Sequence, residues 1–183
     1  MTGPASRVLF SIIISLTSIH PRSVVSGILL PVLIYTSPEG TPTSPQKEVV
    51  RRVLQEALAP EHALDGIDRY LKYCAGKSID SSEMQTYASF LSSASQHDPS
   101  LSSTSSSSVL TTMAPTSPVS CWTDVGVVAI KAVLDRKDTR VTREIVIGIA
   151  HGAEESARVH SADMKFTAML FALVSKYPND VGS

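Results

Sequence analysis

The sequence predicts an all-α protein built of antiparallel helical repeats and interrupted by a disordered linker. Three observations support this fold class. Apolar residues recur at helical spacing over most of the chain. Serines, threonines, prolines and glycines stand where those helices would begin and end. Residues 92–120 are instead rich in serine, threonine and proline, so they cannot bury enough apolar surface to offset the entropy lost on ordering.

The first part of the chain predicts a pair of helices. Arg7 is followed by the apolar run VLFSIIISLTSI, and a second apolar segment starts after Pro21. A buried first helix of a repeat pair is favoured over the alternative, a secretory signal, because a second helical pattern follows directly. Pro31 predicts a kink or an early end of the second helix. The apolar face of the second helix consists of Val24, Val25, Ile28, Leu29, Val32 and Leu33.

The next part predicts a second pair of helices after a loop rich in proline, threonine and glycine. Ser44 is the expected N-cap, with Pro45 at the first helical position. Pro60 is expected to begin the following helix and Gly76 to end it. The predicted buried faces are Val49, Val50, Val53, Leu54, Ala57 and Leu58, and then Ala63, Leu64, Ile67, Tyr70 and Leu71. The two pairs recur at a spacing of about 40 residues, which predicts HEAT-like repeats forming an α-solenoid.

The last third, Trp122 to Pro178, predicts three consecutive amphipathic helices. Thr123 can cap the first, which is apolar over most of its circumference and is therefore expected to be buried between neighbours. Thr142 and Ser161 are the expected N-caps of the other two, and Pro178 limits the third. The predicted apolar face of the first is Val125, Val128, Ala129, Ala132 and Val133, widened by Val127, Ile130 and Leu134. The predicted faces of the other two are Ile145, Val146, Ile149, Ala150, Ala153 and Ala157, and then Phe166, Met169, Leu170 and Leu173.

The chain therefore divides into three predicted parts. Residues 1–91 hold two helix pairs and a possible short helix near residues 84–91, residues 92–120 are the linker, and residues 121–183 are the three-helix segment. A chain of 183 residues is long enough for one core, or for two small cores that flank the linker.

The composition limits the kinds of partner. The formal net charge is −1, and no basic block extends beyond Arg51 and Arg52, so direct nucleic-acid binding is not predicted. Charged residues make up 18% of the chain, below the roughly 25% of typical globular proteins. This low share indicates that a protein partner covers some apolar surface. Cys74 and Cys121 lack metal-ligand spacing; thiols in a reducing compartment are favoured, with a disulfide as the alternative.

Motifs that carry chemistry are incomplete. Residues 76–78 end like a phosphate-binding loop, but Leu71 stands where that loop requires a glycine. His151 and Glu155 can share a helix face, whereas zinc requires three or four ligands and His160 is expected beyond a helix break. The sequence contains no nucleophile elbow and no dinucleotide fingerprint. It therefore predicts a protein without enzymatic activity, cofactor, metal or small-molecule ligand.

Several apolar strings resemble a known family. WTDVGVVAIKAVLDRK, from Trp122, and MKFTAMLFALVSKYP, from Met164, resemble the C-terminal helical-repeat domain of the Fanconi anaemia group E family. The strings HPRSVVSGILLPVLIY and VVRRVLQEALAPEHALDGIDRYL are similar in their order along the chain. The resemblance covers most of the sequence except the serine-rich middle.

The resemblance implies a nuclear, non-catalytic adaptor subunit of the Fanconi anaemia core complex. Members of the family join the group C subunit to the D-two subunit of the DNA clamp, which supports monoubiquitination of the clamp in DNA interstrand crosslink repair. The implied partners are proteins, without direct contact to nucleic acid, membrane or small molecule. The family domain continues with a further helix after the segment that corresponds to Met164–Pro178, where this chain has five more residues.

The expected partner-binding residues are Phe166, Phe171, Lys176 and Tyr177. Phe166 and Phe171 point about 140° apart around a helix with 100° per residue, so one can bind a partner while the other lies in the core; the alternative places both in the core. Two other functions stay open at this point. One is a HEAT-like scaffold outside DNA repair, and the other is a secreted or membrane-associated helical protein with an N-terminal signal segment.

Overall fold

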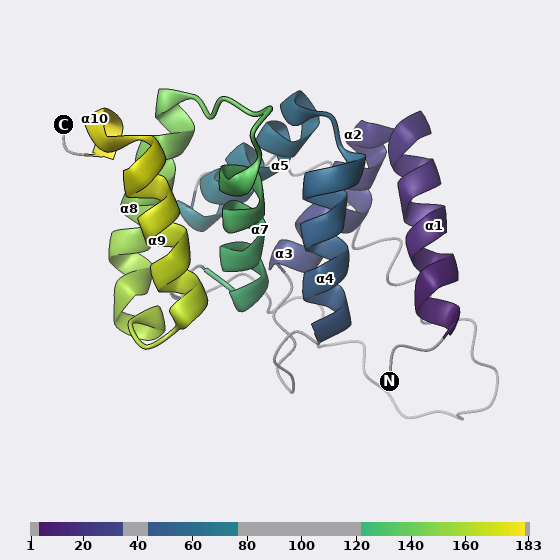
Figure 1. Ribbon diagram of the computed structural model, residues 1–183, viewed down its shortest axis with the longest axis horizontal. Coiled ribbons are helices and arrows are strands. Elements are labelled where there is room, and N and C mark those ends of the chain that lie inside the picture. Colours follow the sequence, from purple (N-terminus) through teal and green to yellow (C-terminus); the bar gives the residue numbers. More distant parts are fainter. Residues whose placement is uncertain (1–3, 35–43, 77–121, 182–183) are drawn as a thin grey trace, which may run out of the picture. The chain divides into compact units, whose positions relative to one another are not determined.

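The computed structural model describes residues 4–34, 44–76 and 122–181 (Figure 1). Every regular element in these ranges is a helix, which confirms the all-α class. The predicted short helix near residues 84–91, the predicted linker 92–120, Cys121 and most of the predicted loop before Ser44 lie outside the described residues.

The helices follow one another with short connections. The first group is α1 (Pro4–Ile19), α2 (Pro21–Val24), the π-helix η1 (Val25–Leu29) and α3 (Leu30–Ile34). The second group is α4 (Ser44–Arg52), the π-helix η2 (Val53–Ala57) and α5 (Pro60–Cys74). The third is α7 (Asp124–Asp135), α8 (Arg143–His160), α9 (Met164–Lys176) and α10 (Pro178–Val181).

Alternate helices contact one another and form two layers. In one layer α1 packs on η2, α4 and η2 pack on α7, and α7 packs on α9. In the other layer η1 and α3 pack on α5, and α5 packs on α8, which also contacts α10. The layers touch through α7, which contacts both α3 and α5 (Figure 1). Helix α7 therefore has neighbours on most of its sides, as its apolar circumference predicts.

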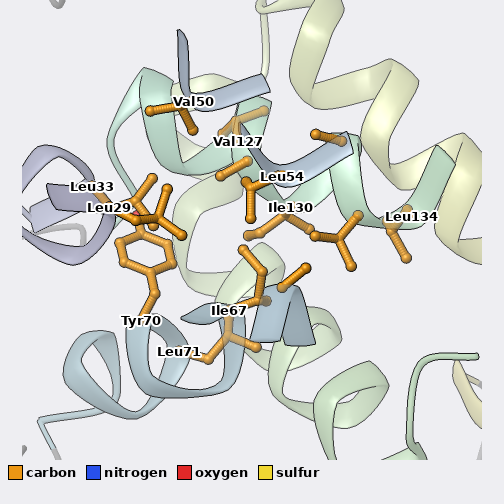
Figure 2. Packing of buried hydrophobic residues seen from close by; sticks show 14 of the residues in the cluster. Leu29, Leu33, Val50, Leu54, Ile67, Tyr70, Leu71, Val127, Ile130 and Leu134 are labelled. Atoms are coloured by element: carbon orange, nitrogen blue, oxygen red, sulfur yellow. The ribbon is translucent and has the colours of Figure 1, made fainter. Parts of the chain in front are cut away.

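The hydrophobic core lies between these layers and combines both ends of the chain (Figure 2). Leu54 and Ile67 are fully buried beside Ile130, and the same cluster continues to Leu33 and Leu134. The chain length allowed either one core or two small cores, and the described residues form one core.

Two glycines allow close approaches that hold this core together. A Cβ atom on Gly126 of α7 would lie 2.0 Å from the hydroxyl oxygen of Tyr70 on α5. A Cβ atom on Gly152 of α8 would lie 2.7 Å from the indole ring of Trp122. Burial raises the pKa of Tyr70 above its usual range, and its hydroxyl accepts a hydrogen bond from the Thr123 N–H at 3.3 Å. Neither approach leaves room for a larger residue.

The helix ends follow local signals in most cases. Thr123 caps α7 as predicted, because its hydroxyl oxygen accepts from the Gly126 N–H at 3.0 Å, and the same hydroxyl donates to the Leu33 carbonyl. Gly76 follows α5 with φ of 66°, the left-handed conformation that glycine adopts at this position. Thr142 stands at the N-cap of α8 but its side chain makes no capping bond.

The predicted cap at Ser161 is wrong. Helix α8 continues to His160, and α9 begins three residues after Ser161, at Met164. Asp163 caps α9 instead, since its carboxylate accepts from the Lys165 N–H at 2.8 Å. A carboxylate at that place also interacts favourably with the positive end of the helix dipole.

Pro31 does not end the second helix, contrary to one of the two outcomes predicted for it. The helix instead widens into η1 before the proline, where the Leu30 N–H bonds to the Val25 carbonyl, and then continues to Ile34. A proline ring collides with the carbonyl four residues earlier in a regular α-helix, and a π-helical turn shifts that carbonyl away.

The expected burial of the first helix holds on one side only. Helix α1 buries Ile13 and Thr17 and places Phe10 beneath the Arg52 guanidinium, 5.1 Å from the ring centre. Its opposite side is open to solvent. Four apolar side chains there are between 41% and 67% exposed: Val8, Ile12, Leu16 and Ile19. None of the described helices has both the length and the apolar character that a membrane span requires.

Arg136 joins the end of α7 to the end of η2. Its guanidinium donates to the carbonyls of Leu54 and Leu58 at 2.6 and 2.8 Å, and it also pairs with Asp138 at 2.7 Å. The hydrogen bond from Arg136 lowers the pKa of Asp138 to about 2. This arginine therefore satisfies backbone acceptors that the helix end would otherwise leave unpaired.

Candidate protein-interaction surface

The structure separates the two phenylalanines of α9. Phe166 is only 2% exposed, stacks on His160 with ring centres 5.7 Å apart and meets Trp122 edge-on at 6.1 Å. It is a core residue, so its predicted role as a partner-binding residue is corrected. Phe171 lies on the opposite side of the helix and is 75% exposed.

Phe171 is part of a larger apolar face that sequence reasoning missed. Met164 is 85% exposed and Val174 is 52% exposed, and together with Phe171 they define what we name the α9 outer face. Met164 and Phe171 are seven residues apart, so they lie on nearly the same line along the helix. This spacing was the available signal, and it was obscured because α9 is apolar on its buried side as well.

Lys176 and Tyr177, also predicted to bind a partner, make contacts within the protein. The Lys176 ammonium donates to the carbonyls of Leu134 and Arg136 at the end of α7. The Tyr177 hydroxyl accepts from the Val141 N–H at 3.3 Å. These bonds fasten the end of α9 to α7 and to the connection that follows α7.

A groove of about 620 Å³ runs between the α9 outer face and α7. Met164 and Phe171 line it from α9, and Lys131 and Asp135 line it from α7. The small residues Thr167, Ala168, Ala172 and Ser175 leave space between them. The groove is therefore apolar along α9 and charged along α7.

A second groove of about 480 Å³ lies between α4 and α7 and shares Lys131 and Asp135 with the first. Its charged lining from α4 is Lys47, Glu48 and Arg51. Hydrogen bonds, chiefly from Arg51, lower the pKa of Glu48 to about 2, so this carboxylate is ionised at neutral pH. The two grooves thus form one continuous surface across α4, α7 and α9, named here the groove surface.

A cluster of possible metal ligands lies at the start of α7 and α9. Single ligand atoms of Asp124, His160 and Asp163 lie within 4.8 Å of one another. His160 is buried at the end of α8, which corrects the prediction that it lies beyond a helix break. One of its ring nitrogens, Nε2, is 2.8 Å from the Trp122 carbonyl.

Each carboxylate of this cluster stands at a helix N-terminus, where the helix dipole favours negative charge. Asp124 is the first residue of α7 and pairs with Lys47 at 3.0 Å, and Asp163 caps α9. The ammonium group beside Asp124 opposes a bound cation. We therefore assign the cluster to positioning the helix ends. His151 and Glu155, 4.0 Å apart, lie on an exposed helix face as predicted.

Comparisons of the chain with protein-family models, with curated proteins and with solved structures find no match.

Proposed function

We propose that the protein is a non-catalytic adaptor that binds partner proteins through the α9 outer face. The observation that carries this proposal is the exposure of Phe171 and Met164 on a helix whose other side is in the core. Burying apolar area stabilises an association by about 25 cal/mol per Å². Aromatic residues and methionine are enriched in protein interfaces, where a few large side chains contribute most of the binding free energy.

We also propose that the fold is a HEAT-like α-solenoid with a disordered serine-rich linker. The alternation of helix contacts supports the solenoid, since α4, α7 and α9 follow one another in one layer and α5 and α8 in the other. Stacked helix pairs bury a continuous core and create extended binding surfaces. The composition of residues 92–120 supports the linker.

The assembly we propose is the Fanconi anaemia core complex in the nucleus. There the chain would join the group C subunit to the D-two subunit of the clamp and support its monoubiquitination in interstrand crosslink repair. The support is the resemblance of four sequence strings, which fall on α2 to α3, on α4 to α5, on α7 and on α9. These helices supply most of the core and the α9 outer face.

Affinity purification of the full chain from crosslinker-treated cells tests this assignment. We expect the group C and D-two subunits to be recovered, and recovery of at least one to fall when Phe171 and Met164 are both replaced by serine. The matched control replaces the exposed Ile12 and Leu16 of α1 by serine. Recovery of neither subunit with a folded chain would refute the assignment to this complex.

A reporter fused to the first 30 residues tests the nuclear location. We expect the fusion to stay inside the cell, because the helix that follows the apolar run packs in the core through Val25 and Leu29. Secretion of the reporter would overturn the nuclear location in favour of the secreted alternative.

A further inference from the structure

The partner chemistry that fits the groove surface can be deduced from its shape and charge. Met164 and Phe171 are about 10 Å apart along the helix axis at 1.5 Å per residue, beside a groove of about 620 Å³. A helix laid in such a groove presents side chains at positions i, i+3, i+4 and i+7, and two of them one heptad apart would match this spacing. This spacing fits a short amphipathic helix.

The charges around the grooves are mainly positive. Five cations line the two grooves, Lys47, Arg51, Lys131, Lys165 and Lys176, against the two carboxylates Glu48 and Asp135. The whole chain has a net charge of −1, so this excess is local. Complementary potentials steer association and select the partner more than they raise affinity.

Two of these cations are not neutralised by a carboxylate among the described residues. Lys165 is exposed at the start of α9 and takes part in no ion pair there. Lys176 donates to backbone carbonyls, which leaves its positive charge in place at the other end of the helix. The α9 outer face thus has a positive group near each end.

We infer that the groove surface binds an acidic amphipathic helix of a partner protein. Its apolar side chains would contact Met164 and Phe171, and its Asp or Glu side chains would lie toward Lys165 and Lys176. This inference rests on the proposed adaptor function and specifies the partner of the same surface. An oligonucleotide would use the cations but would leave the apolar contacts unused.

Selection from a helix-biased peptide library displayed on phage tests the inference with the full chain as bait. The library encodes acidic and basic residues in equal proportion. We expect enriched peptides to have apolar residues at positions i, i+3 or i+4, and i+7, with an excess of Asp and Glu. Basic peptides, peptides without this spacing, or no enrichment would overturn the inference.

Fluorescence anisotropy of the most enriched peptide then locates its binding site. We expect Phe171→Ser and Lys165→Glu each to raise the Kd at least about tenfold, which corresponds to about 1.4 kcal/mol. Because both residues are exposed, the variants should keep the circular dichroism spectrum and Tm of the parent. The control, Ile12→Ser on α1, should leave the Kd unchanged. Unchanged affinity in both groove variants would overturn the inference.

Other occupants give distinct results. Binding of a labelled single-stranded oligonucleotide that Lys165→Glu weakens and Phe171→Ser leaves unchanged, with no enrichment of acidic peptides, would assign the surface to nucleic acid. A dimer in sedimentation velocity that Phe171→Ser dissociates would assign it to a second copy of the chain. Peptide binding without recovery of the Fanconi subunits would refute the proposed complex but not the binding of an acidic helix. Recovery of the subunits without peptide binding would refute the binding of an acidic helix alone.

Discussion

Helices α1 and α9 both expose apolar side chains, yet the structure fastens them very differently. Helix α9 buries Phe166, Met169 and Leu173, is capped by Asp163, and is tied to α7 by Lys176. Among the side chains of α1 that the structure describes, Ile13 and Thr17 are buried and Phe10 lies under the Arg52 guanidinium.

The surroundings of the two exposed faces also differ. The α9 outer face adjoins the positively charged groove surface, whereas the exposed side chains of α1 lie on a helix whose single charged residue is Arg7. A rigid support reduces the entropy cost of binding, and nearby charge selects the partner. Exposed apolar area alone therefore does not define a binding site, because the support of the helix and the charge around its exposed face also decide what binds.

The largest expected effect distinguishes the two sides of α9. Phe166→Ala should lower the free energy of unfolding by about 3–5 kcal/mol, because it leaves a cavity between Trp122 and His160. Phe171→Ala should change it by less than about 0.5 kcal/mol, since that ring is exposed. Urea unfolding followed by circular dichroism measures both. Similar losses of unfolding free energy in the two variants would contradict the placement of Phe166 in the core and Phe171 on the surface.

The next effect compares α1 with α9 directly. Because few of the described side chains of α1 are buried, this helix should open locally more often than α9. Hydrogen exchange at the central amides of α1 should be at least about 30-fold faster than at those of α9, which corresponds to about 2 kcal/mol in opening free energy. Equal protection of the two helices would contradict the difference in support described above.

A smaller effect concerns the bonds that fasten α9. Lys176→Met should lower the free energy of unfolding by about 1–2 kcal/mol, since the carbonyls of Leu134 and Arg136 lose a charged donor. Lys165→Met is the matched control, because that lysine is exposed on the same helix, and it should change stability by less than about 0.5 kcal/mol. The two variants can be compared by urea unfolding. Equal losses would show that the Lys176 bonds do not stabilise the helix.

The smallest expected effect is a pH dependence at the end of α7. Arg136 lowers the pKa of Asp138 from 3.8 to about 2, so folding depresses this pKa. A carboxyl group whose pKa is lower in the folded than in the unfolded state stabilises the fold at pH values above its unfolded pKa. That stabilisation is lost as the pH falls through the folded pKa. Asp138→Asn should therefore lower the Tm at pH 7 and become indistinguishable from the parent below about pH 2. If the Tm of Asp138→Asn is still lower than that of the parent at that pH, the Arg136–Asp138 ion pair is not the cause of the difference.

Local signals made the helices and the core predictable. The periodicity of Val50, Leu54 and Ile67 depends on neighbouring positions in the chain, and so do the cap at Thr123 and the left-handed Gly76. Long-range contacts could not be predicted in this way. The burial of His160 depends on the carbonyl of Trp122, which is 38 residues away along the chain. The bonds of Lys176 likewise require knowledge of where α7 ends.

The exposed faces were unpredictable for a different reason. Periodicity reveals which sides of a helix are apolar, but it does not reveal which of them another element will cover. Helices α1, α7 and α9 are all apolar around much of their circumference. Neighbours surround α7, while Val8 and Ile12 on α1 and Phe171 on α9 are open to solvent.

The junction at Tyr70, Thr123 and Leu33 has a consequence for how the polypeptide can be divided. It joins α3 and α5 to the start of α7, so the described core is assembled from side chains on both sides of residues 77–121. Fragments ending at Gly76 and starting at Trp122 would each carry an unfinished core, with Tyr70 on one and Gly126 on the other. The two fragments are thus complementary, as the halves of a split reporter are. When co-expressed, they would complete the shared core by associating and folding together.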